Sequence, residues 1–141
     1  MQMTRWYWAQ VGGTLIEEFP AVDRGPNRGA RLLDGVIVLG QRTRIASPAE
    51  VSLEGRDIVV VQTKNSRLGM YLMGQTLFSM ELLRKFNPKS IRSVALCAAD
   101  DEVLHPLLER YPNCEVVVCP KEISHLTPHS RRTRPKAVPT V

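Results

Sequence analysis

Two stretches of the chain place polar side chains within or at the end of apolar runs. Asp34 lies inside the run at residues 32–39, and Gln62 and Lys64 follow the run at residues 58–61. Side chains of a strand alternate between faces, so Gln62 and Lys64 point the same way, about 6–7 Å apart. A carboxylate, an amide oxygen and an amine can together hold a divalent metal ion and a phosphate. The sequence therefore predicts such a site at Asp34, Gln62 and Lys64.

The residues before Asp34 predict a helix followed by a hairpin. A helix is expected over residues 4–19, because apolar side chains recur there at helical spacing, although Gly12 and Gly13 weaken its middle. Pro20 ends it. A short strand at residues 21–23, a turn at 25–29 and a strand at 30–39 then form a hairpin.

The residues after Asp34 predict a sheet covered by helices. A strand at residues 57–63 is apolar on both faces, which is typical of a central strand. The expected elements that follow are a helix at 70–86, a strand at 91–97, a helix at 101–110 and a strand at 114–119. The predicted fold class is α/β, with the order α-β-β-β-α-β-α-β and a mixed central sheet flanked by helices.

This order and these residues resemble the PD-(D/E)xK nuclease superfamily, whose fold many restriction endonucleases and Holliday junction resolvases share. The resemblance covers residues 13–97 and implies a restriction-endonuclease-like α-β-β-β-α-β core. Asp34 stands where the family has an acid on its second strand, and Gln62-x-Lys64 stands where it has an acid-x-Lys on its third. The helix that follows carries Gln75.

Gln62 departs from the commoner Asp or Glu and is similar to the Mrr-like branch of the superfamily. An amide oxygen can coordinate a hard cation but brings no charge, so Asp34 needs a second carboxylate. The resemblance implies a glutamate from the first helix, and two are candidates. Gly13-x-x-x-Glu17 fits the Mrr-like spacing, whereas helical periodicity puts Glu18 nearer the apolar stripe and the sheet.

The function that the resemblance implies is a metal-dependent endodeoxyribonuclease. Mg²⁺ or Mn²⁺ would be held by Asp34, Gln62 and either Glu17 or Glu18, with the Thr63 carbonyl as a further candidate ligand. Lys64 would orient the water or offset charge on the phosphate. A homodimer is expected, because one copy has one site and a DNA duplex has two strands. The alternative is a weak or inactive nuclease-fold module that binds nucleic acid or a partner protein.

Several cationic or polar residues could contact a nucleic-acid backbone. They are Asn65 and Arg67 after the third strand, Arg28 and Arg31 in the hairpin, and Arg131, Arg132 and Arg134 near the C-terminus. Exposed turns often have this composition without binding anything, and a basic tail can serve solubility alone. The sequence leaves open DNA or RNA, and duplex or junction.

Charge divides the chain of 141 residues into two parts. Residues 1–120 are expected to form one nuclease-like domain. Residues 121–141 carry +4 of the net charge of +5 and are expected to form a flexible basic tail. No apolar run approaches the ~20 residues of a membrane-spanning helix, and the start of the chain does not resemble a signal peptide, which favours a cytoplasmic protein.

The three cysteines are odd in number, which is typical of reduced core thiols. Cys114, Cys119, His125 and His129 are all types of residue that bind zinc. Their spacing matches no strong zinc module, so the sequence favours two core thiols and two tail histidines.

Overall fold

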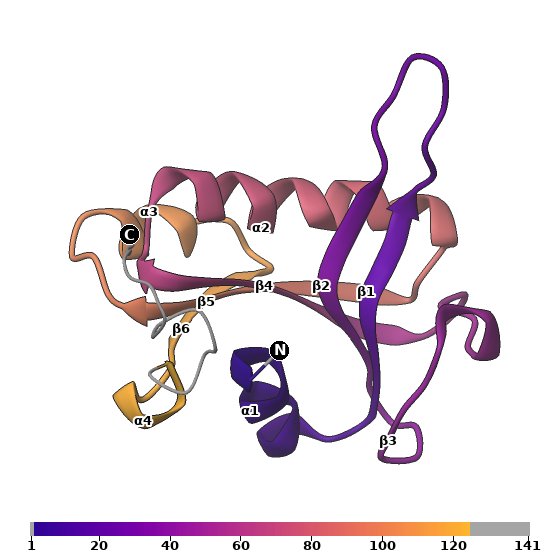
Figure 1. Ribbon diagram of the computed structural model, residues 1–141, viewed down its shortest axis with the longest axis horizontal. Coiled ribbons are helices and arrows are strands. Elements are labelled where there is room, and N and C mark those ends of the chain that lie inside the picture. The colour runs from indigo at the N-terminus through magenta and orange to yellow at the C-terminus, as the bar shows by residue number, and fades with distance from the viewer. Residues whose placement is uncertain (1, 125–141) are drawn as a thin grey trace, which may run out of the picture.

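A six-stranded mixed sheet organises the computed structural model, which describes residues 2–124 (Figure 1). The helices are α1 (Gln2–Val11), α2 (Met70–Leu83), α3 (Leu104–Leu108) and α4 (Lys121–Ser124), with 3₁₀ turns at Pro48–Glu50 and Arg84–Phe86. The strands are β1 (Thr14–Val22), β2 (Arg31–Val38), β3 (Arg44–Ile45), β4 (Asp57–Arg67), β5 (Ser90–Ala99) and β6 (Cys114–Val118).

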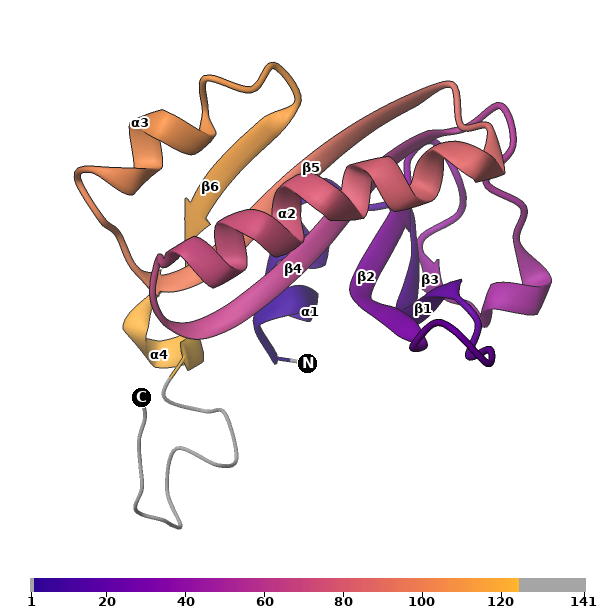
Figure 2. The same cartoon turned by 90° about the horizontal axis from the view of Figure 1, so that it is seen from above.

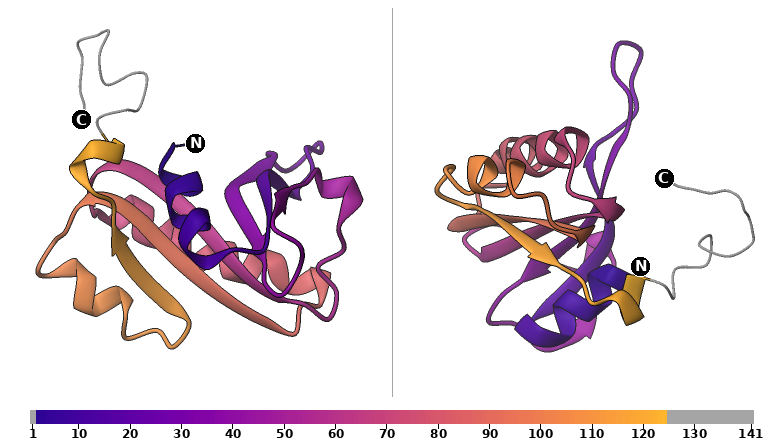
Figure 3. Two further views of the ribbon diagram at one scale, coloured as in Figure 1. Left: turned by 90° about the horizontal axis from the view of Figure 1, so that it is seen from below. Right: turned by 90° about the vertical axis from the view of Figure 1, so that its left-hand side faces the viewer.

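The strands lie in the order β3-β1-β2-β4-β5-β6. β2 runs antiparallel to both of its neighbours, β1 and β4. The other pairs, β1–β3, β4–β5 and β5–β6, are parallel. Seen from above, α2 crosses the sheet over β4 and β5 (Figure 2). The β1–β2 hairpin projects beyond the sheet on the same side as α2 (Figures 1 and 3).

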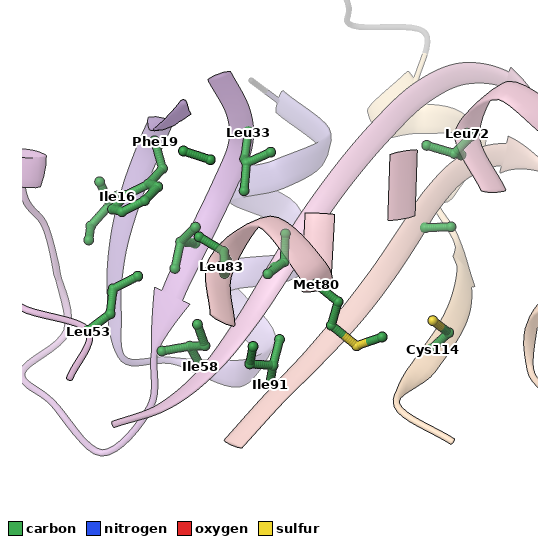
Figure 4. Close-up of a cluster of buried hydrophobic side chains, with 14 of the residues drawn as sticks. Ile16, Phe19, Leu33, Leu53, Ile58, Leu72, Met80, Leu83, Ile91 and Cys114 are labelled. Atoms are coloured by element: carbon green, nitrogen blue, oxygen red, sulfur yellow. The ribbon is translucent and has the colours of Figure 1, made fainter. Parts of the chain in front are cut away.

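Each face of the sheet carries its own apolar core. Ile58 and Val60 of β4 pack beneath α2, in the core shown in Figure 4. Val59 and Val61 point to the other face, where Met3 and Tyr7 of α1 cover them. All four β4 side chains are at most 1% exposed, which confirms the expected central strand.

The predicted helix over residues 4–19 is wrong. α1 ends at Val11, and residues 14–22 form β1. Gly12 and Gly13 end the helix because they adopt φ values of +77° and +84°, in the left-handed region that favours glycine. A Cβ on Gly13 would lie 2.5 Å from the Val38 carbonyl oxygen, so the chain turns closely against β2 there.

Most other predicted elements are confirmed with shifted ends. The hairpin, β4, α2, β5 and β6 are present, and the larger elements keep the expected order. The helix expected at 101–110 is confined to α3, because the Asp101 carboxylate accepts the Val103 and Leu104 N–H groups and so begins the helical turn there. The short β3 and α4 were not predicted.

The coarse fold class is therefore confirmed as α/β, with a mixed sheet between helices. The finer restriction-endonuclease-like core stays a prediction. α4 extends the fold past residue 120, and Ile123 packs against the core beneath α1. The rest of the predicted tail lies outside the described residues. None of the helices within residues 2–124 combines the length and apolar character needed to cross a lipid bilayer.

Candidate active site

The candidate site lies where β2 and β4 separate. The two strands pair from Val38 and Ile58 to Gly35 and Val61. Beyond this fork β2 leads into the hairpin, while β4 continues beside β5 to Arg67.

The Asp34 carboxylate replaces a strand carbonyl at this fork. At the start of the antiparallel ladder between β2 and β4, the Leu39 N–H donates to the Asp57 carbonyl. If the same alternation continued along the two strands, the Thr63 N–H would donate to the Leu33 carbonyl. Instead, Asp34 Oδ2 accepts the Thr63 N–H at 2.8 Å and the Thr63 hydroxyl at 3.2 Å. Asp34 thus contacts the residue between Gln62 and Lys64 directly, with no apolar group between them.

Gln62 makes the reciprocal bond. Its Oε1 accepts the Asp34 N–H at 3.2 Å, and its Nε2 donates to Ser79 Oγ on α2 at 2.7 Å. The Ser79 hydroxyl in turn donates to the Gln75 carbonyl at 2.5 Å. Because Gln62 is only 4% exposed, these bonds satisfy an amide that would otherwise be costly to bury.

Lys64 is exposed beside this network. It makes no ion pair with any residue that the structure describes. Its position follows Thr63 on β4, so an exposed amine lies one residue from the peptide that holds Asp34. The structure therefore brings the three residues predicted for catalysis to one fork, with Gln62 inside the protein.

The two candidate glutamates lie on β1, not on the first helix as predicted. Glu17 pairs with Gly35 in the register and binds Arg5 of α1 through two bonds of 2.8 and 2.9 Å. The hydrogen bond from Arg5 lowers the pKa of Glu17. Glu17 is thus engaged with α1, away from the α2 side on which Gln62 is bonded.

Glu18 is the glutamate that the register places opposite Asp34, between the pairs Glu17–Gly35 and Phe19–Leu33. It is exposed and has a φ of +50°, which is uncommon for a residue with a side chain. Ile16 and Phe19 both pack in the α2 core, although an undisturbed strand would point them to opposite faces. The backbone irregularity at Glu18 allows this switch of face.

Asp34 and Glu18 are the predicted metal ligands whose carboxylates make no ion pair within residues 2–124. Within residues 2–124, the hydrogen bonds of the Asp34 carboxylate involve Oδ2 alone, which leaves Oδ1 available. Mg²⁺ commonly takes one or two protein carboxylates and completes its shell with water and phosphate oxygens. No cluster of three or more His, Cys, Asp and Glu residues suited to a metal occurs within the described part of the chain.

The predicted nucleic-acid contacts lie in different places. Arg28 and Arg31 belong to the hairpin, where they donate to the Asp23 and Ala30 carbonyls at 2.9 and 3.2 Å. Arg67, at the end of β4, donates to the Asp100 carbonyl. Asn65 is half-buried and already has an interaction. Arg131, Arg132 and Arg134 lie outside the described residues.

The cysteines agree with the prediction of reduced core thiols. Cys97, Cys114 and Cys119 are all buried and free. Burial raises the pKa of the Cys97 and Cys119 thiols to about 11. The other zinc-type residues, His125 and His129, lie outside the described part of the chain.

Thr63 and Ser79 both belong to the site. Thr63 was expected to offer its carbonyl to the metal ion, whereas the structure uses its N–H and hydroxyl. Ser79 was not predicted. Ser79 had a detectable signal, because it lies four residues after Gln75 and so shares a helix face with it. The bonds from Thr63 to Asp34 had no such signal, because they depend on where β2 leaves β4.

No protein-family model matches the chain, and no curated protein or solved structure is significantly similar to it. The resemblance to PD-(D/E)xK nucleases therefore rests on the order of elements and the residues at the fork.

Proposed function

We propose that the protein is a metal-dependent nuclease that hydrolyses phosphodiester bonds in DNA at the β2–β4 fork. One observation carries the proposal. The Asp34 carboxylate is held against the Thr63 backbone of β4 at 2.8 Å, one residue from the exposed Lys64. An anchored carboxylate beside a cation suits a phosphate ester with a bound metal ion.

Each residue at the fork then has a distinct role. Asp34 and Glu18 would hold Mg²⁺ or Mn²⁺, and Gln62 would position Asp34 through the Asp34 N–H. When bound, the metal ion supplies Lewis-acid polarisation of the phosphate and a coordinated water of lowered pKa. Lys64 would bind a phosphate oxygen and offset the charge that develops during hydrolysis.

A second candidate is a nucleic-acid-binding or protein-binding module without activity. The observation that favours it is the bonding of Gln62, whose two amide ends are both engaged within the protein. Asp34 and Gln62 already accept backbone N–H groups from each other's strands without a ligand, which gives both residues a structural role.

Plasmid cleavage separates the two candidates. The purified protein is incubated with supercoiled DNA and Mg²⁺ or Mn²⁺, and we expect nicked or linear products that disappear with chelator. Asp34→Asn keeps a hydrogen-bond acceptor for Thr63 but removes the charge, and Lys64→Ala removes the amine. Each should reduce cleavage at least ~100-fold, while DNA binding by Lys64→Ala persists.

Two matched variants serve as controls. Asp57→Asn changes an exposed aspartate at the start of β4, at the end of the strand opposite to the fork, and Lys89→Ala removes an exposed lysine far from the fork. Both should cut like the unmodified protein. Intact binding without cleavage under either metal would favour the module, and equal cleavage by Asp34→Asn would remove the fork from the mechanism.

A further inference from the structure

A groove separates the hairpin end of β2 from α2. It has a volume of about 490 Å³, and its lining includes Arg31, Leu32, Tyr71, Gly74, Gln75 and Phe78. Gln62 and Ser79 also contribute to the lining, so the groove adjoins the fork. The hairpin and α2 lie on the same side of the sheet (Figures 1 and 3). Residues of both β2 and α2 line the groove.

The walls of the groove expose large apolar side chains. Met70 is 77% exposed, Tyr71 75%, Phe78 64% and Leu32 57%. Single exposed apolar residues are ordinary, but four around one groove mark a binding surface. Tyr71 and Phe78 are aromatic, and they are seven residues apart on α2, so they share one helix face.

Gly74 lies in the wall of the groove, on α2 between Tyr71 and Phe78. Glycine within a helix is destabilising relative to alanine. A Cβ on Gly74 would meet no atom within 4 Å, and its φ does not fall in the left-handed region. Within the described part of the chain, neither the packing nor the backbone therefore requires glycine at this position. The missing side chain instead deepens the groove between Tyr71 and Phe78.

The polar side chains of the groove favour one kind of occupant. Arg31 is the one charged residue in its described lining. Lys64 is exposed at the adjoining fork, where the Asp34 and Glu18 carboxylates also lie. A second copy docked here by two-fold symmetry would bring like cations together, whereas a polyanion would be attracted. The half-buried Gln75 offers an amide donor and acceptor, which match the edge of a base.

We infer that this groove binds an unpaired nucleobase of a single-stranded nucleic acid, stacked on Tyr71 and Phe78. The inference deepens the proposed function, since the backbone of the same strand would reach the fork. Binding in the groove requires no metal and no cleavage, so it can be tested by itself.

The test is fluorescence anisotropy in chelator with a labelled single strand of about 12 nucleotides. A strand of the same length without bases keeps the phosphates, and we expect it to bind more weakly, as should the duplex. Phe78→Ala and Tyr71→Ala should each lower affinity for the intact strand roughly 5- to 150-fold, the range expected for the loss of one stacked base. Tyr111→Ala, at an exposed aromatic distant in sequence and outside this groove, should leave it unchanged.

Gly74→Ala separates a ligand role from a role in folding. The substitution should raise the melting temperature, because alanine favours the helix and its Cβ meets no atom of residues 2–124 within 4 Å. It should nevertheless weaken binding of the intact strand, since the new methyl group fills the groove. A variant that is more stable and yet binds less well cannot be explained by misfolding.

Two results would overturn the inference. The first is equal affinity for the intact and the base-free strands, which would show that only the backbone is bound. The second is a change of oligomeric state in Phe78→Ala with no change in strand affinity, which would make the groove an interface between copies. Base-dependent binding without any metal-dependent cleavage would instead contradict only the proposed nuclease.

Discussion

At the scale of single residues, the fork shows how polar side chains are accommodated in an apolar sheet. Asp34 and Gln62 each bond to the backbone of the opposite strand, and Gln62 also bonds to α2. Each polar group therefore gains a partner where the ladder between β2 and β4 ends. The same bonds hold the Asp34 carboxylate at the surface, where a cation can reach it.

Ser79→Ala tests this network. It removes the acceptor of the Gln62 Nε2 donor while Gln62 stays buried. We expect the free energy of unfolding to fall by about 1–3 kcal/mol, which is the usual cost of an unsatisfied buried group. Urea denaturation measures the change, and Ser52→Ala, at an exposed serine, is the control. Equal stability of the two variants would show that the bond to α2 contributes nothing.

At the scale of elements, the glycines between α1 and β1 end the helix and so place Glu17 and Glu18 on β1. Gly12→Ala places a side chain in the left-handed region, which should cost about 1–2 kcal/mol but causes no close contact. Gly13→Ala should cost more, because its Cβ would lie 2.5 Å from the Val38 carbonyl oxygen. Thermal denaturation of both variants checks the order, and a less stable Gly12→Ala would contradict it.

A second element-scale contact joins β5, α3 and β6. His105 Nδ1 lies 2.8 Å from Asp100, and its Nε2 lies 3.1 Å from Glu109, which also accepts the Val116 N–H. The hydrogen bond with Asp100, followed by the charge of Glu109, raises the pKa of His105 above its usual 6.5. Protonated His105 therefore stabilises the folded protein fully below pH 6.5, and this stabilisation is lost as the pH rises through the raised value.

His105→Gln should accordingly lower the melting temperature more below pH 6.5 than at alkaline pH. Thermal scans of both proteins across this range give the difference at each pH. The control is Lys89→Ala, whose difference from the unmodified protein should not depend on pH in this range. If His105→Gln lowers the melting temperature by the same amount at every pH, the hydrogen bonds of His105 contribute to stability but its charge does not.

At the scale of the whole molecule, the cations near the C-terminus supply most of the net charge. Replacing Arg131, Arg132 and Arg134 by glutamine lowers the net charge from +5 to +2. If these residues neutralise phosphates, the logarithmic salt dependence of binding to single-stranded DNA should become shallower by at most about 2. Anisotropy titrations at several salt concentrations measure the slope, and an unchanged slope would exclude them from the interface.

Much of the fold could be predicted because its signals are local. Gly, Pro and Asn residues mark the hairpin and the end of α2, and the apolar run at residues 58–61 identifies the central strand. The first helix was predicted too long because a local signal, the helical spacing of apolar residues, continues past its end. Leu15 and Phe19 continue the helical spacing of Trp8 and Val11, but two glycines end the helix before them.

The sequence by itself determined the order of the larger elements and the presence of Asp34, Gln62 and Lys64 beside one another in the sheet. Only the tertiary structure decided that Glu18 lies opposite Asp34 and that Glu17 pairs with Arg5. It also decided that the Thr63 N–H donates to the Asp34 carboxylate. The groove between the hairpin end of β2 and α2 likewise depends on the tertiary structure. These features depend on register and on the point where two strands separate, and contacts between residues distant in the chain set both.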